Sequence, residues 1–278
     1  MKKVLVPTDF STNSEAGVRY AINWATQQKL ELVFVHVFYV LKATRWTDAY
    51  YEKHSAEVEE LWKIKFDTFI ADMYEKMDVK PGKYSCVFIQ GIGADVTILD
   101  YCRKNPSIDC VCISTRGAGK LKKIFGTNTG NLITKSATPI LAVPQNYKTA
   151  EISKVLYATD LRDYATEITK VVAFARPLKT EIEVVHFTWP GKFPMEETMI
   201  KAAFKKQFKY GLTLDFENND AEHSLVENLK KQIKIRKPSL VLMFTDQKRT
   251  FFQKLFLASK SETLSFETKV PLLVFNKP

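Results

Sequence analysis

The chain has 278 residues, of which 45% are hydrophobic and 26% are charged, and its formal net charge is +10. This length allows two ordinary domains, each with its own core. A membrane-spanning helix needs about 18 consecutive apolar residues, and no stretch of the sequence is that long. Lysines and arginines interleave with acidic residues, which argues against binding to nucleic acid or to a membrane. The N-terminus lacks the apolar segment of a secretion signal, so we expect a cytoplasmic protein.

The first half of the chain alternates short apolar runs with helical patterns. Strands are predicted over residues 4–6, 32–38, 84–89, 110–114 and 140–143. Ser11, Asn13 and Ser14 can cap a helix that follows the first strand. Its apolar face is predicted from residues at helical spacing, namely Val18, Ala21, Ile22 and Ala25. A long helix is predicted over residues 49–77, with Glu57, Glu59, Glu60, Lys63 and Lys65 on a solvated face and its aromatic residues against the sheet.

The second half repeats the first about 150 residues later. Val4, Asp9 and His36 have counterparts in Val155, Asp160 and His186, and the helical spacing recurs at Ile168, Val171, Val172 and Ala175. Further strands are predicted over residues 183–187, 212–216, 240–244 and 272–275. A repeat of this length indicates two copies of one domain, over residues 1–145 and 152–278, with a polar linker at residues 145–151. Each copy is predicted to be a doubly wound α/β domain with a parallel sheet covered on both faces.

The four cysteines lie in the first half, and none forms a C-x-x-C pair. A zinc site or a redox motif is therefore not expected. Cys110 and Cys112 share one face of a predicted strand, which favours reduced thiols packed in the core.

A glycine-containing segment over residues 114–133 carries the strongest chemical signal. It leaves a strand through Gly117 and Gly119, passes three lysines, and enters a helix at the sequence GTNT, residues 126–129. Glycines permit close backbone approach, and a helix start offers free N–H groups to an anion. The segment thus predicts a phosphate cradle, although a glycine turn with an ordinary helix cap explains the same pattern. It matches neither the Walker loop nor G-x-G-x-x-G.

Asp9 follows the first strand and has three candidate roles. It can accept a hydrogen bond from a ribose hydroxyl, hold Mg²⁺ through water, or cap the next helix. His36 and His186 lie at equivalent strand ends, where a structural role is favoured over a catalytic one. No Ser-His-Asp or Cys-His arrangement is evident, and no metal-ligand spacing links the histidines.

The sequence VPTDFS at residues 6–11, the His36-Val37 pair and the glycine segment with GTNT resemble the universal stress protein (UspA) family. The resemblance extends over nearly the whole chain as a tandem of two family domains. It implies a five-stranded parallel sheet with strand order 3-2-1-4-5, and a pseudo-dimer that brings residues 141–143 near residues 273–275. One branch of the family binds ATP or AMP through G-x2-G-x9-G-[ST]. The resemblance then places adenine and ribose near Pro7, Asp9, Val37 and Ile113, and phosphates near Gly117, Gly126, Thr127 and Asn128.

The chain departs from the family pattern in both halves. Ser114, which we include among the expected ligand-binding residues, stands where the first motif glycine is expected. Eight residues rather than nine separate Gly117 from Gly126. In the second half, Ala158, Phe187 and Phe244 replace Pro7, Val37 and Ser114, and residues 245–266 contain no glycine. We therefore expect an adenine nucleotide in the first domain, with Mg²⁺ able to accompany it. The second domain is expected to be degenerate and without a nucleotide, because the rings of Phe187 and Phe244 would obstruct the adenine slot.

Three functions remain open at this point. The first is a stress-response protein whose nucleotide alters a surface for an unidentified protein partner. The second is an interaction scaffold without a ligand, alone or as a homodimer. The third, a weak ATPase, is disfavoured because no general base is evident beside the expected phosphates.

Overall fold

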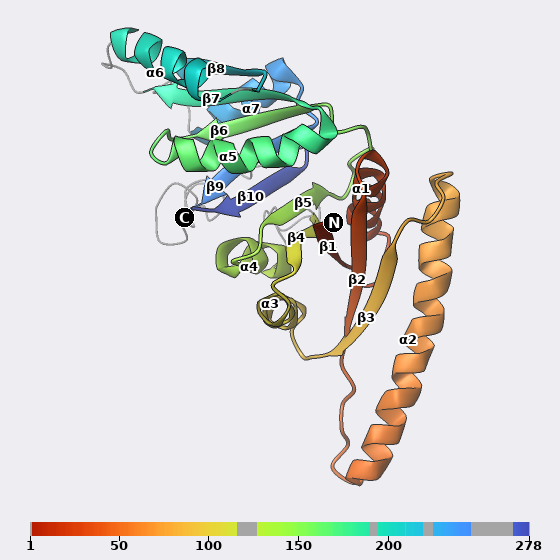
Figure 1. Ribbon diagram of the computed structural model, residues 1–278. Coiled ribbons are helices and arrows are strands. Elements are labelled where there is room, and N and C mark those ends of the chain that lie inside the picture. The colour runs from red at the N-terminus through yellow and green to blue at the C-terminus, as the bar shows by residue number, and fades with distance from the viewer. Residues whose placement is uncertain are drawn as a thin grey trace. The chain divides into compact units, whose positions relative to one another are not determined.

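A computed structural model describes residues 2–115, 127–188, 194–208, 210–218, 225–245 and 269–277 (Figure 1). The described residues form two compact units, the first comprising residues 2–115 and 127–149 and the second beginning at residue 150. Among the described residues, no helix combines the length and the apolar character that crossing a bilayer requires.

The first unit alternates strands and helices, as the sequence predicts. Its elements are β1 (Lys2–Pro7), α1 (Glu15–Gln27), β2 (Leu30–Phe38), α2 (Asp48–Lys76), β3 (Tyr84–Gln90), α3 (Ala94–Lys104), β4 (Ile108–Thr115), α4 (Thr127–Lys135) and β5 (Ile140–Pro144). The described strands pair in parallel in the order β3-β2-β1-β4-β5, which confirms the order implied by the family resemblance.

Helices cover both faces of this sheet. One face carries α1 and α2, and the other carries α3 and α4 (Figure 1). The central strands are buried throughout because both of their faces are covered, and Val4, Leu5 and Val6 have no exposed surface. Val18, Ala21 and Ile22 of α1 are buried against the sheet, as their spacing predicts, while Ala25 is half-buried.

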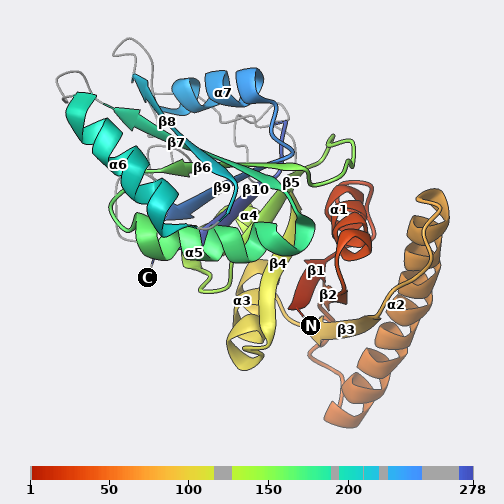
Figure 2. The same cartoon turned by 45° about the horizontal axis from the view of Figure 1, so that its top comes forward.

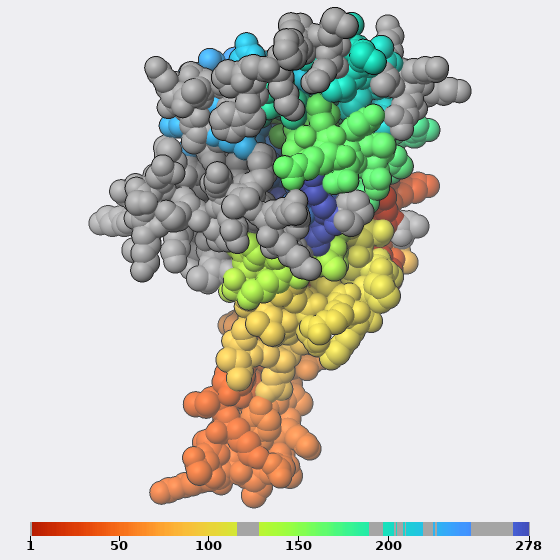
Figure 3. All heavy atoms as spheres, turned by 90° about the vertical axis from the view of Figure 1, so that its left-hand side faces the viewer, coloured from red at the N-terminus to blue at the C-terminus, as the bar shows by residue number. Residues whose placement is uncertain are grey.

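The long helix α2 packs along only part of its length. Its buried residues, Phe66, Ile70, Met73 and Tyr74, all belong to its second half. The first half extends past the carboxyl ends of β2 and β3, and the orange atoms of α2 and its preceding loop reach beyond the yellow atoms of α3 and β4 (Figures 1 and 3). The expectation that the aromatic residues of this helix pack on the sheet is therefore wrong for Tyr50, whose exposed fraction is 52%.

The second unit repeats the arrangement. Its elements are β6 (Lys154–Thr159), α5 (Tyr164–Ala175), the 3-10 turn η1 (Arg176–Leu178), β7 (Glu181–Thr188), α6 (Pro194–Gln207), β8 (Leu212–Asn218), α7 (Leu225–Arg236), β9 (Leu240–Thr245) and β10 (Leu272–Asn276). Its described strands pair in parallel in the order β10-β9-β6-β7-β8. Helices α5 and α6 lie on one face of this sheet and α7 lies on the other (Figure 2).

Candidate functional site

Three of the predicted site residues lie on one face of the first sheet, at the edge where β1 and β4 end. Pro7 pairs with Val35, so it shares a face with Val35 and, two residues further along β2, with Val37. Leu5 pairs with Val111, which by the same alternation puts Pro7 and Ile113 on a common face. Pro7, Val37 and Ile113 are all half-buried. They form an apolar floor where the strand order reverses, the place at which open α/β sheets bind ligands.

Asp9 stands beside this floor, in the turn that follows β1. Its Oδ1 accepts a hydrogen bond from the Ser11 backbone N–H at 3.1 Å and one from the Ser11 hydroxyl. Partial burial alone would raise the pKa of Asp9, but the hydrogen bonds from Ser11 outweigh it and lower the pKa below its ordinary value. Among the described residues, no lysine or arginine forms an ion pair with Asp9. The carboxylate is exposed and ionised, so it can accept hydrogen bonds from a ligand.

The helix-capping role considered for Asp9 is not what the structure shows. Helix α1 begins at Glu15, and its N-cap position is occupied by Ser14, whose side chain makes no capping hydrogen bond. The Ser14 hydroxyl instead donates to the Ser11 carbonyl at 2.8 Å and lies 2.9 Å from the Thr8 hydroxyl. Asp9 and Ser14 therefore stabilise the turn itself rather than the first N–H groups of the helix.

The start of α4 is fixed beside the end of β4. The Thr129 hydroxyl donates to the backbone carbonyl of Ser114 at 3.3 Å, and Thr129 is buried. Asn128, one residue earlier, is exposed. The N–H groups in the first turn of a helix have no partner within the helix, so this end can receive an anion. Gly117 and Gly126 lie outside the described residues, as does the side chain of Thr127.

Ser114 faces away from the apolar floor. Its hydroxyl accepts a hydrogen bond from the Gly17 backbone N–H at 2.7 Å and donates to the Ser14 carbonyl at 3.0 Å. A Cβ atom on Gly17 would lie 2.8 Å from the Ser114 backbone nitrogen, so only glycine allows α1 to approach β4 this closely. Ser114 was predicted as a ligand-binding residue, but the structure uses its hydroxyl to fasten α1 to the sheet.

Aromatic packing also holds the turn that follows β1. Phe10 adopts a φ of 61°, and its ring lies 4.4 Å from that of His36, which in turn lies 4.6 Å from Trp62 of α2. His36 Nδ1 is 2.9 Å from the Thr8 carbonyl oxygen. Burial lowers the pKa of His36, so the ring is neutral near pH 7. His36 thus has the structural role expected from the sequence, while nothing in the sequence pattern singled out Phe10.

The equivalent edge of the second unit has a different surface. Ala158 pairs with Val185 and with Met243, so Phe187 and Met243 share its face. Ala158 is buried, and Phe187 is half-buried in the position that corresponds to Val37. A phenyl ring therefore lies on the floor where the first unit has a smaller valine, as predicted.

Phe244 was expected to obstruct the same slot, but it lies on the opposite face. Its ring is 5.8 Å from that of Tyr157 and 5.1 Å from that of Phe275, and Lys170 of α5 lies over it at 5.8 Å. The alternation of side chains along β9 separates it from Met243. Phe244 is therefore a packing residue beneath α5, in the place where Ser114 fastens α1 in the first unit.

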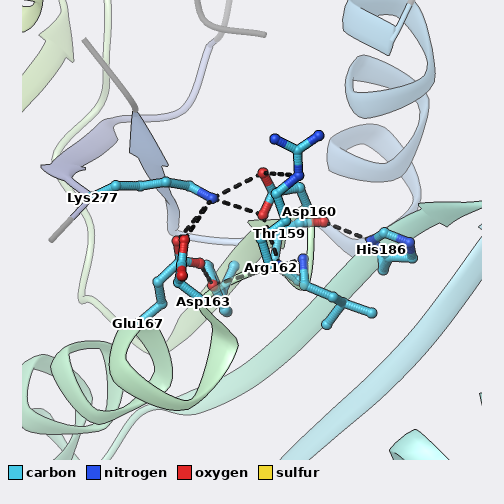
Figure 4. Close-up of polar contacts among 9 residues, drawn as sticks. Thr159, Asp160, Arg162, Asp163, Glu167, His186 and Lys277 are labelled. Carbon is cyan, nitrogen blue, oxygen red and sulfur yellow. Dashed lines mark hydrogen bonds and ion pairs between the residues drawn. The ribbon is translucent and has the colours of Figure 1, made fainter. Parts of the chain in front are cut away.

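A lysine spans the carboxyl edge of the second unit (Figure 4). Lys277 Nζ lies 2.8 Å and 2.9 Å from the two carboxylate oxygens of Asp160, 3.5 Å from Asp163 and 3.3 Å from Glu167. Glu167 is almost fully buried and also accepts a hydrogen bond from the Tyr157 hydroxyl. The counterpart of Asp9 is thus neutralised by a side chain of its own unit.

Lys277 was not identified from the sequence, although the repeat contained a signal for it. Its backbone N–H donates to the Thr245 carbonyl at 2.9 Å, just as the Gln145 N–H donates to the Thr115 carbonyl at 3.1 Å. The two residues are therefore equivalent. Gln145 is neutral and its amide donates to Asn13, whereas Lys277 brings a positive charge to the same edge.

Comparison with known proteins identifies relatives in sequence and in fold. The sequence model described as the universal stress protein family matches residues 1–144. No curated protein matches the chain significantly. The two-unit fold resembles the crystal structure of a universal stress protein from Archaeoglobus fulgidus DSM 4304, with a TM-score of 0.68 at 19% identity, covering 99% of this chain and 96% of that one.

Two further solved structures extend the comparison. The cytoplasmic domain of a prokaryotic cation chloride cotransporter is similar with a TM-score of 0.52 at 9% identity, covering 98% of this chain and 94% of that one. A universal stress protein in complex with cAMP has a TM-score of 0.36 at 13% identity and covers 51% of this chain and 96% of that one. At these identities, the Archaeoglobus and cotransporter likenesses concern the fold alone.

Proposed function

Because this chain belongs to the universal stress protein family, we propose that its first unit binds an adenine nucleotide, ATP or AMP, at the carboxyl edge of β1 and β4. One observation carries the proposal. Pro7, Val37 and Ile113 share a half-buried face beside an ionised Asp9 that has no basic partner among the described residues. An apolar floor with a few convergent polar groups is the usual form of a small-molecule site.

The described residues fit the parts of such a ligand. The adenine ring would lie on the apolar floor, and the ribose hydroxyls would donate to Asp9. The phosphates would approach the start of α4 at Thr127 and Asn128, which Thr129 fixes to β4. Gly117 and Gly126 are proposed to complete this cradle, and Mg²⁺ would be held through the phosphates.

We infer that the second unit binds no nucleotide and has a structural role. The ring of Phe187 lies on the floor, and Lys277 bonds both oxygens of Asp160, the carboxylate that would receive a ribose. A ligand would have to displace an ammonium group that contacts three carboxylates, one of them buried. Breaking such a pair leaves a buried charge uncompensated, which is costly.

Calorimetric titration with ATP tests the proposal. The wild-type chain should bind one ATP, and Asp9→Asn should weaken binding about tenfold or more because a charge-assisted hydrogen bond is lost. Asp160→Asn is the matched control in the second unit and should leave the affinity unchanged. Equal losses in both variants would reject the assignment to the first unit, and absence of heat in the wild-type chain, purified free of nucleotide, would reject binding altogether.

A nucleotide-free interaction scaffold is the second candidate, and one feature favours it. The middle of α2 exposes Leu61 and Ile64 by 61% and 59%. Large exposed apolar side chains on one helix are often contacted by a protein partner. The titration above separates the candidates, since a scaffold gives no ATP binding in any variant.

A further inference from the structure

The hydrogen bond between His36 and Thr8 fixes the tautomer of the imidazole ring. A backbone carbonyl oxygen can only accept, so Nδ1, 2.9 Å from the Thr8 oxygen, must carry the proton. In the neutral ring, Nε2 then has a lone pair and no hydrogen.

The second ring nitrogen is enclosed without a partner. His36 is 6% exposed, and within the described part of the chain Nε2 has no hydrogen-bond partner. Aromatic rings pack around the imidazole, with centroids 4.4 Å from the imidazole centroid for Phe10, 4.6 Å for Trp62 and 6.3 Å for Phe88. A neutral acceptor tolerates these surroundings, whereas a protonated Nε2–H would be a buried charged donor without an acceptor.

Two charged groups of the described residues act on this ring. Asp9 in the turn after β1 favours the protonated form, and Lys65 on α2 opposes it. The other groups packed on the ring, Phe10, Trp62, Phe38 of β2 and Phe88 of β3, carry no charge. Burial is the largest influence and lowers the pKa of His36.

The same ring holds both neighbours of Asp9. Thr8, which precedes Asp9, is fixed through its carbonyl by Nδ1–H, and Phe10, which follows, packs against the ring face. The Phe10 N–H in turn donates to the Thr8 hydroxyl at 3.1 Å, closing the turn. The position of the Asp9 carboxylate therefore depends on His36 although the two side chains form no hydrogen bond.

We propose that His36 is a positioning residue for the ligand of the first unit, and that it positions Asp9 only in its neutral, Nδ1-protonated form. This inference rests on the proposed nucleotide site. Protonation of Nε2 can be accommodated only if the cluster of Phe10, Trp62 and Phe88 opens to give the new N–H an acceptor. Opening moves Phe10, and with it the carboxylate one residue away, so acid weakens ligand binding through His36.

The second unit supplies a matched control. His186 Nδ1 lies 2.9 Å from the Thr159 carbonyl, as Figure 4 shows, and Leu161 replaces Phe10 with the same φ of 61°. Its neighbouring carboxylate, Asp160, is already held by Lys277. A change at His186 should therefore alter the second unit without affecting ligand binding in the first.

The test compares ATP dissociation constants between about pH 8 and about pH 5.5, in the wild-type chain, His36→Asn and His186→Asn. Asparagine retains an N–H donor near the position of Nδ1 and has no proton to gain. At the upper pH, His36→Asn should bind ATP more weakly than the wild type, because asparagine lacks the ring against which Phe10 packs. Below the pKa of His36, the ratio of wild-type to His36→Asn dissociation constants should rise by up to about tenfold per pH unit. The titration of ATP itself is common to both proteins and cancels in this ratio, and His186→Asn should follow the wild type.

A second measurement uses the wild-type chain alone, so it does not require that a variant folds. Nitrogen-15 spectra of the histidine rings in the wild-type chain should show His36 with its proton on Nδ1, and the amide resonances of Asp9 and Phe10 should shift with the same pH midpoint as that ring. A proton on Nε2, or equal pH profiles for wild type and His36→Asn when both bind ATP, would overturn the inference and leave the proposed function intact. Absence of ATP binding even at the upper pH would overturn the proposed function, and this role of His36 with it.

Discussion

Lys277 Nζ lies 2.8 Å from Oδ1 and 2.9 Å from Oδ2 of Asp160, so a lysine holds the carboxylate that corresponds to Asp9. The two units share the strand order around their central strands, the turn with a positive φ and the histidine bonded to that turn. They differ in what meets the aspartate. In the second unit it meets an internal cation. In the first unit the described residues that bond Asp9 belong to its own turn, which leaves its carboxylate available to a ligand.

Replacing Lys277 with methionine should destabilise the second unit. The substitution keeps much of the length of the side chain but leaves Glu167, which is buried, without its cation. The expected loss is about 2–4 kcal/mol in the free energy of unfolding, measured by urea denaturation. Lys104→Met, which removes an exposed pair with Asp100, is the control and should cost far less. Equal losses in the two variants would show that the ion pairs of Lys277 stabilise the fold no more than an exposed ion pair does.

Glu167 should make stability depend on pH in a defined direction. Burial raises the pKa of Glu167, against the opposing effects of Tyr157 and Lys277. A carboxyl group whose pKa is raised by folding binds its proton more tightly in the folded state. Its contribution to stability is therefore complete below its unfolded pKa of about 4.3 and is lost as pH rises through the folded value.

Urea denaturation of the wild type and of Glu167→Gln at a series of pH values tests this dependence. The stability of the wild type relative to the variant should fall as pH rises from about 4.3 through the folded pKa of Glu167. Glu52→Gln, an exposed residue on α2, provides the baseline. A relative stability that rises with pH would mean that the pair with Lys277 outweighs burial.

Gly17→Ala should destabilise the first unit. The new methyl group would lie 2.8 Å from the Ser114 backbone nitrogen, and backbone cannot move aside as the end of a flexible side chain can. We expect a loss of about 1–3 kcal/mol, despite the better helix propensity of alanine. Gly82→Ala is the control, since a Cβ there meets nothing within 4 Å. Similar unfolding midpoints for the two variants would argue against the close approach of α1 to β4.

Exchanging the residues that distinguish the two floors tests the ligand surface. Val37→Phe gives the first unit the side chain found at Phe187 and should weaken ATP binding about tenfold or more, since the ring fills the adenine position. The reverse change, Phe187→Val, should not create a second site, because Lys277 still holds Asp160. A second ATP bound by Phe187→Val would show that the ring alone closes the second unit.

The sequence was sufficient for the strands because buried parallel strands are continuous apolar runs and the two halves of the repeat can be compared, while the strand order followed from the family resemblance. The face on which a residue lies was harder to predict. Ser114 was expected to bind the ligand and Phe244 to obstruct its slot, yet both lie one residue along their strands from the floor and face α1 or α5. Contacts between segments far apart in the sequence also could not be predicted. Lys277 meets Asp160 across more than a hundred residues, and only the alignment of Lys277 with Gln145 hinted at it.

The location of ATP on the full chain tests the central claim most directly. Backbone amide resonances of an isotope-labelled sample, titrated with ATP, report both units at once. We predict shifts at Asp9, Val37, Ile113 and Asn128 that saturate at one ATP per chain, with the resonances of Asp160, Phe187 and Met243 unchanged. Shifts of similar size at Asp160 and Phe187, or no shift at either aspartate, would contradict it.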